Sequence, residues 1–136
     1  MRVYRTMTEQ QAGNVVRAYA TAIATVVGVD ARRTETLVTP MACENEFGQL
    51  AEDGRFYVQG TWQMPLPPGE QAAALARLHD GWAAQGFEIK QFEMFSETEG
   101  VVIAENPVDE VEVMVESGRP PIAVAVMVMT PCYQPT

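Results

Sequence analysis

Two cysteines offer the clearest chemistry in this 136-residue chain, because they are its only thiols and can form one disulfide. Cys43 and Cys132 lie beside proline-containing, turn-like sequence and bracket nearly all of the expected strands. A bond between them would close a loop of about 90 residues and would stabilise the fold by roughly 4–5 kcal/mol on the chain-entropy model. The alternative is a pair of separate buried thiols. Their spacing is too wide for a CxxC redox or zinc motif.

His79 is the only histidine, and its neighbours along the expected helix are Leu75, Leu78 and Trp82. A histidine in such an apolar stripe is more often an edge residue of the core than a general base. Asp80 follows it directly and is therefore expected to point elsewhere on the helix surface. The chain contains neither a GxSxG elbow nor a glycine-rich phosphate loop. We predict no catalytic residue and no cofactor.

Acidic pairs are frequent, and the alternate carboxylates of Glu110 and Glu112 are expected to share one face of a strand. Such a pair suits a cation, but an exposed strand face explains it equally well. The run Glu44-Asn45-Glu46-Phe47-Gly48 lacks the longer ligand ladder of an EF-hand. We predict no metal site.

Aromatic side chains suggest a different site, a ligand pocket in the layer between helices and sheet. Aromatic residues also fill such layers as ordinary core, which is the more frequent outcome. In the pocket interpretation, His79 or Asp80 would supply the polar group. The candidate ligand-binding residues are Tyr57, Trp62, His79, Trp82 and Tyr133.

A helix is expected to begin near residue 8, where the sequence fits a capping box in two ways. The first pairs Thr6 with Glu9, and the second pairs Thr8 with Gln11. Apolar residues then recur at three- and four-residue spacing, which predicts an amphipathic helix over residues 8–27. A second apolar stripe predicts a helix over residues 70–85, and a glycine follows each helix as a stop signal.

Five strand-like runs are expected to form the sheet. Gly60 in the first run suggests a bulge or a close backbone contact, and a phase slip at Lys90-Gln91 suggests a bulge in the second. The last run is apolar on both faces, which predicts an interior strand whose alanines let a helix pack closely. Residues 30–53 show no clear period and are predicted to form a loop. The strand-like runs are residues 55–64, 87–95, 101–104, 110–116 and 122–129.

The order of these elements predicts one α+β domain over residues 1–136. We expect a two-layer sandwich in which a curved, mainly antiparallel sheet of four or five strands carries two helices on one face. This element order is similar to that of cystatin-like and NTF2-like folds.

The charge of the chain is −9 and is unevenly distributed. Residues 1–42 carry five arginines and three acidic residues, whereas residues 43–136 carry four basic and fifteen acidic residues. The acidic part would repel nucleic acid and anionic lipid, so we predict no nucleic-acid partner. It forms either a solvated surface or a face for a cationic partner.

The run His79-Asp80-Gly81-Trp82-Ala83-Ala84-Gln85-Gly86-Phe87, with the later Thr130-Pro131-Cys132-Tyr133, resembles small secreted proteins and lipoproteins of high-GC actinobacteria. The resemblance covers residues 43–133. Many of these proteins have no assigned activity, so it implies export and carries over no catalytic residue. Their lipobox cysteine is absent here, so membrane anchoring would require a further N-terminal segment. No export signal is visible, because Arg17 interrupts the apolar stretch at residues 15–29.

Three functions follow as hypotheses. The leading one is a non-catalytic extracytoplasmic domain, secreted or attached to the cell envelope, that binds a protein or small-molecule partner. The second is a small-ligand-binding or isomerase-like protein with a pocket between helices and sheet. The third is a cytoplasmic acidic protein that binds or inhibits a basic partner. Neither the partner nor the oligomeric state follows from the sequence.

Overall fold

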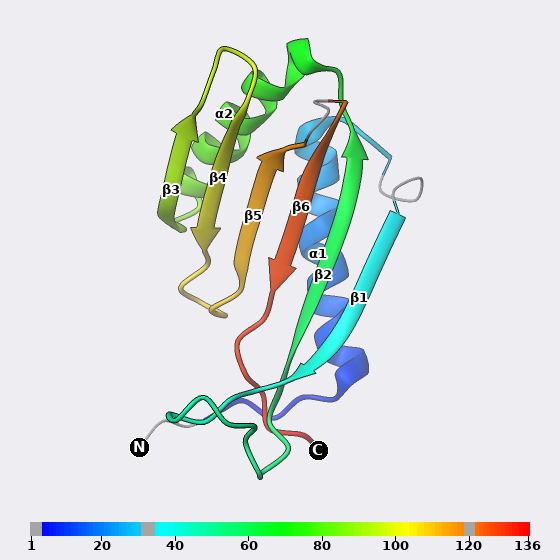
Figure 1. Cartoon of the computed structure of the whole chain (residues 1–136), viewed down its shortest axis with the longest axis vertical. Coiled ribbons are helices and arrows are strands. Elements are labelled where there is room, and N and C mark those ends of the chain that lie inside the picture. The colour runs from blue at the N-terminus through cyan, green and yellow to red at the C-terminus, as the bar shows by residue number, and fades with distance from the viewer. Residues whose placement is uncertain (1–3, 31–34, 119–121) are drawn as a thin grey trace.

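The fold consists of two helices and one six-stranded sheet, so the predicted α+β class is confirmed (Figure 1). The computed structural model describes residues 4–30, 35–118 and 122–136. The elements follow in the order α1 (Glu9–Val27), β1 (Glu35–Ala42), β2 (Phe56–Pro65), α2 (Pro68–Ala84), β3 (Glu88–Met94), β4 (Gly100–Glu105), β5 (Glu112–Ser117) and β6 (Ala123–Met129).

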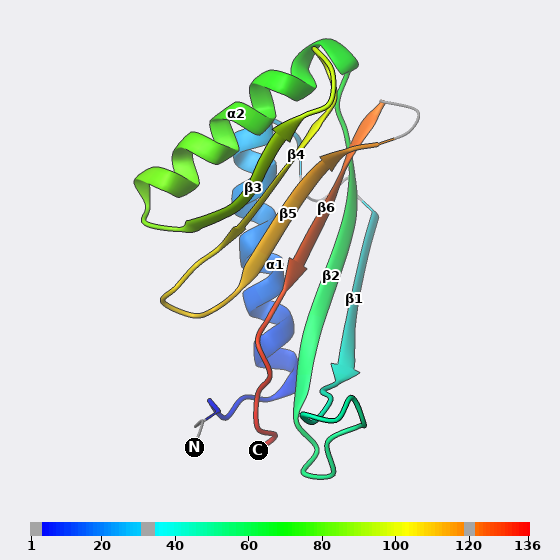
Figure 2. The same cartoon turned by 60° about the vertical axis from the view of Figure 1, so that its left-hand side comes forward.

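The strands pair antiparallel throughout, in the order β1-β2-β6-β5-β4-β3. The last four strands form the predicted meander, and β2 pairs with β6 to add the β1–β2 hairpin at its side. Both helices lie on the same side of the sheet (Figure 2). α1 packs mainly on β2, with β1 and β6 beside it, and α2 packs on β3, β4 and β5. The sheet thus has one helix-covered face.

The sheet holds one strand more than the sequence predicts, because β1 lies in the segment that we expected to be a loop. Pro40 obscures this strand, since proline is rare inside sheets. The Cys43 N–H donates to the Arg55 carbonyl oxygen at 3.0 Å, so alternate residues from Cys43 back to Met41 turn their N–H groups toward β2. Pro40 therefore turns its nitrogen to the free edge, where the missing donor breaks no bond with β2.

α1 begins with the second of the two predicted capping boxes. The Thr8 hydroxyl oxygen accepts the Gln11 N–H at 3.0 Å, and the Gln11 side-chain oxygen accepts the Thr8 N–H at 2.9 Å. Gly28 ends the helix in the left-handed region, at a φ of 91°. α2 begins two residues before the predicted start, because Pro68 has the fixed φ that favours the first helical turn.

The predicted bulge in β3 is confirmed, since the register with β4 shifts between Ile89 and Gln91. Gly60 has an unbroken register with both neighbouring strands, so it marks the close contact and not a bulge. A Cβ atom at Gly60 would overlap a Val16 methyl group and lie 2.6 Å from Trp62 Cζ3. α1 can therefore lie against β2 only because residue 60 has no side chain.

β6 is an interior strand, as predicted, but its alanines do not face a helix. Val124, Val126 and Val128 are buried toward the helices, and they stand opposite helix-facing positions of β2. The alanines and methionines of β6 turn to the other face. A strand that is apolar on both sides leaves this choice open, and the register with Gly60 and Trp62 decides it.

We expect Gly60→Ala to destabilise the fold by about 1–3 kcal/mol, because the added methyl group must displace α1 or the Trp62 ring. Gly69→Ala is the matched control, since nothing lies within 4 Å of a Cβ atom there. That change should be neutral or slightly stabilising. Urea unfolding followed by tryptophan fluorescence measures both. Equal midpoints for the two variants would contradict the close contact.

Candidate functional site

Three of the five candidate ligand-binding residues lie in the core at separate places. Trp62 is buried on β2 beside Gly60. Trp82 of α2 stacks on Phe87, with ring centroids 6.1 Å apart and planes 5° from parallel. Tyr133 is buried edge-on against Phe56, with ring centroids 6.0 Å apart. The structure therefore brings these rings into the core packing and does not gather them around one space.

The other two candidates, Tyr57 and His79, lie apart from each other. Tyr57 stands on β2 opposite Met41 of β1 and faces away from the helices. The His79 ring packs on Phe92, with centroids 4.5 Å apart. Its Nδ1 atom lies 3.0 Å from a carboxylate oxygen of Asp80, so the expectation that Asp80 points elsewhere is wrong. Neighbouring side chains on a helix can still meet when a short carboxylate folds back over the backbone.

The face of the sheet opposite the helices, here named the open face, is organised in three rows that run across the strands. Cross-strand partners share one face, so the strand registers define these rows. The middle row, mainly apolar, consists of Gln91, Ile103, Met114, Met127, Thr61 and Leu37. One flanking row consists of Glu88, Glu105, Glu112, Met129, Gln59 and Thr39, and the other, from β3 to β2, of Glu93, Val101, Glu116, Ala125 and Gln63.

The flanking rows concentrate negative charge over β3, β4 and β5. Glu105 stands directly opposite Glu88 on one side and Glu112 on the other. Like charges in such pairs destabilise a sheet. Lys90 is the only basic residue within the six described strands, and its ammonium group lies 3.9 Å from Glu105. The open face therefore keeps an unfavourable arrangement of carboxylates that one lysine offsets only in part.

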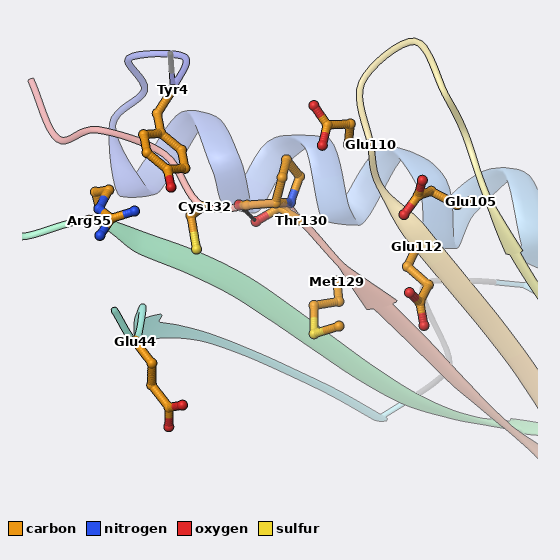
Figure 3. Close-up of a pocket in the computed structure, with 10 residues that line it drawn as sticks. Tyr4, Glu44, Arg55, Glu105, Glu110, Glu112, Met129, Thr130 and Cys132 are labelled. Carbon is orange, nitrogen blue, oxygen red and sulfur yellow. Dashed lines mark hydrogen bonds between the residues drawn. The ribbon is translucent and has the colours of Figure 1, made fainter. Parts of the chain in front are cut away.

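An open pocket of about 290 Å³ adjoins the acidic end of the open face (Figure 3). Glu105, Glu110 and Glu112 lie on one side of it, and Met129 lies between them and the opposite side. On that opposite side the Arg55 guanidinium lies 4.5 Å from the centre of the Tyr4 ring. The lining residues are Tyr4, Glu44, Arg55, Glu105, Glu110, Glu112, Met129, Thr130, Pro131 and Cys132.

Sequence reasoning missed this pocket because its lining comes from five separate segments of the chain. It also placed Glu110 on a strand face with Glu112, which is wrong. β5 begins at Glu112, and Glu110 lies in the preceding turn at a φ of 62°. The nearest signal in the sequence was the group of acidic residues Asp109, Glu110 and Glu112.

A hydrogen-bond network holds the turn between β4 and β5 against α1. The Tyr19 hydroxyl donates to an Asp109 carboxylate oxygen at 2.5 Å and accepts from the Asn106 amide at 2.8 Å. The Arg5 guanidinium donates to the Val108 carbonyl oxygen at 2.8 Å. Burial raises the pKa of the Tyr19 hydroxyl above its ordinary value, and the bond to Asp109 raises it further. The network fixes the turn that carries Glu110.

The Cys43 and Cys132 sulfur atoms lie 2.08 Å apart, a disulfide-bonding distance. The bond joins the end of β1 to the segment that follows β6, and Cys132 also lines the acidic pocket. Cys43 is buried, and its carbonyl oxygen accepts the Ala51 N–H at 2.8 Å, which closes the intervening loop. Such a bond is compatible with a location outside the reducing cytoplasm.

Within residues 4–30, 35–118 and 122–136, no group of three or more His, Cys, Asp or Glu side chains is placed to hold a metal ion. Neither described helix combines the length and the hydropathy needed to cross a membrane.

Comparison with protein-family models, with curated proteins and with solved structures finds no match for the chain.

We expect reduction of the disulfide to lower the free energy of unfolding by roughly 2–5 kcal/mol, because the bond restricts a long loop in the unfolded chain. Thermal melts with and without dithiothreitol measure this loss. The Cys43→Ala, Cys132→Ala double variant should melt near the reduced wild type and should not respond to the reductant. A double variant that melts with the oxidised protein would contradict a stabilising bond.

We expect stability to fall as the pH rises above about 10, because the folded chain holds the Tyr19 proton more tightly than the unfolded chain. Below that pH both states keep the proton, so the contribution is fully present. Tyr19→Phe should lower stability at neutral pH by about 1–2 kcal/mol and should reduce the alkaline loss. Some loss should remain, because burial also raises the pKa of Tyr133. Urea titrations from pH 7 to pH 11 test this, and equal slopes for both proteins would contradict it.

Proposed function

We propose that this chain is a non-catalytic, extracytoplasmic binding domain that recognises its partner through the open face. The observation that carries the proposal is the contrast between the two faces of the sheet. Two helices bury one face, whereas no element of the described residues crosses the other (Figure 1). Ile103, Met114 and Met127 stay partly exposed in the middle row, and Leu37 is 67% exposed at its end.

Partly exposed apolar side chains that lie side by side are typical of an interaction surface, especially where polar residues surround them. Methionine suits such a surface, because its flexible thioether adapts to a partner without one fixed geometry. Met114 and Met127 stand directly opposite each other on neighbouring strands, with Met129 two residues further along β6. This grouping supports recognition of a protein surface.

The extracytoplasmic part of the proposal rests on the disulfide. Structural disulfides persist in oxidising compartments and are rare in the cytoplasm. The Cys43–Cys132 bond spans 89 residues and ties the end of β1 to the segment that follows β6. A cytoplasmic acidic interaction protein would share the same open face but would need no such bond.

A ligand pocket between helices and sheet receives less support. Trp62, Trp82 and Tyr133 are each at most 7% exposed and pack on neighbouring side chains. His79 and Asp80 contact each other at the outer part of α2, where Asp80 is 81% exposed. The aromatic residues thus act as core filler, and the polar pair does not converge with them.

Site-specific photocrosslinking in the native host tests the proposal. A benzoylphenylalanine is placed at Met127 on the open face or, as control, at Ala73 on the exposed side of α2. We expect one discrete crosslinked product from position 127, recovered from the cell-envelope or extracellular fraction, and none from position 73. The product should disappear when Met114→Asp is added, because a charge then enters the middle row. Equal products from both positions, or none from position 127, would overturn the proposal.

A further inference from the structure

We infer that the open face binds a basic amphipathic helix of a partner protein, laid across the strands along the middle row. This inference rests on the proposed function and adds the chemistry of the partner. Three observations carry it: the direction of the apolar row, the spacing of the acidic rows, and the near absence of basic residues from the strands.

The middle row runs across the strands, so a partner segment that covers the row must run in the same direction. Neighbouring strands lie about 4.8 Å apart, and the row from β3 to β1 therefore spans about 24 Å. An α-helix of about 16 residues has that length. A helix presents apolar residues at three- and four-residue spacing, which would place four or five side chains along the row.

The two flanking rows, which carry the glutamates, lie on either side of the middle row. The distance between them suits a helix. Glu112, Met114 and Glu116 follow one another on the open side of β5, one in each row. Two residues of strand rise about 6.8 Å, so the acidic rows are about 13–14 Å apart, close to the 10–12 Å diameter of an α-helix. Lysine or arginine side chains on both flanks of the helix would then reach the glutamates.

The charge of the open face indicates that the partner surface is positively charged. Five glutamates flank the row over β3, β4 and β5, and Lys90 alone offsets them within the described strands. Glu88, Glu105 and Glu112 stand directly beside one another in spite of their repulsion. Positive charge between or above them would relieve that repulsion as well as adding attraction.

The same observations disfavour three other occupants. A second copy would bring the same glutamates against a face whose strands hold one basic residue, in a chain of charge −9. An added strand would meet Pro40, which offers no donor at the β1 edge, or the bulge between Ile89 and Gln91 at the β3 edge. An anionic lipid surface would be repelled by the acidic rows.

The test uses a synthetic 16-residue helical peptide with leucine on one face and lysine on both flanks. The control peptide has the same composition in a scrambled order that destroys the apolar face. NMR titration of the labelled full chain should shift the methyl signals of Ile103, Met114 and Met127 with the first peptide. The scrambled peptide should bind at least tenfold more weakly. Equal binding, or shifts confined to the helix-covered side, would overturn the inference.

A matched pair of triple variants tests the charge requirement. Glu88→Gln, Glu112→Gln and Glu116→Gln remove three charges from the acidic rows, and we expect about tenfold weaker binding at low salt. Glu9→Gln, Glu46→Gln and Glu97→Gln remove three exposed charges elsewhere and should change binding less than twofold. An equal loss in both variants would show attraction to net charge alone and would overturn the inference.

The remaining outcomes separate this inference from the proposed function. If the position-127 crosslink forms in the host but neither triple variant weakens the peptide, the open face binds a partner of another kind and only the inference fails. Sedimentation velocity without peptide tests self-association. A dimer that Met127→Glu disrupts would show that the open face binds a second copy of the chain. It would also overturn the inference that a basic helix binds there. Absence of the position-127 crosslink would contradict the proposed function itself.

Discussion

The close packing of α1 on β2 is the constraint on which the rest of the structure depends. Gly60 permits it, because any side chain at that position would collide with Val16 and Trp62. Once this contact is made, every residue of β2 is assigned to a face, and the register with β6 carries the assignment across the sheet. The valines of β5 and β6 then fill the layer beneath the helices. Met114, Met127 and Met129 therefore lie on the open face.

The segments around the acidic pocket are held by bonds between parts of the chain that are distant in sequence. The disulfide ties the end of β1 to the segment after β6, and Tyr19 ties the β4–β5 turn to α1 through Asp109. The N–H of Phe56 also donates to the Tyr133 carbonyl oxygen at 3.1 Å. These links give the acidic pocket a fixed wall without any contribution from the middle of the sheet. Binding at the open face would therefore meet a surface whose acidic end is already ordered.

Local sequence patterns predicted most helices and strands. The features that they missed depend on contacts between segments that are distant in sequence. The bulge near Lys90 and the capping box at Thr8, one of the two that the sequence offers, are encoded within a few residues, so local patterns indicate them. β1 was missed because Pro40 is tolerated only at a free sheet edge, and the edge position depends on the pairing with β2. The face of β6 was misassigned because both of its sides are apolar. The acidic pocket was missed because its walls meet only after the chain has folded.

If the open face binds a partner as proposed, its glutamates reflect a conflict between stability and binding. A sheet that had to satisfy folding alone would gain by replacing one of Glu88, Glu105 and Glu112 with a neutral or basic residue, since each lies beside a like charge. Local choices of this kind, which oppose the fold and which only the Lys90–Glu105 contact offsets in part, tend to mark functional sites. The compensation need not come from within the chain. A partner that brings positive charge would supply it only in the complex, and the repulsion in the free protein would then increase the gain on binding.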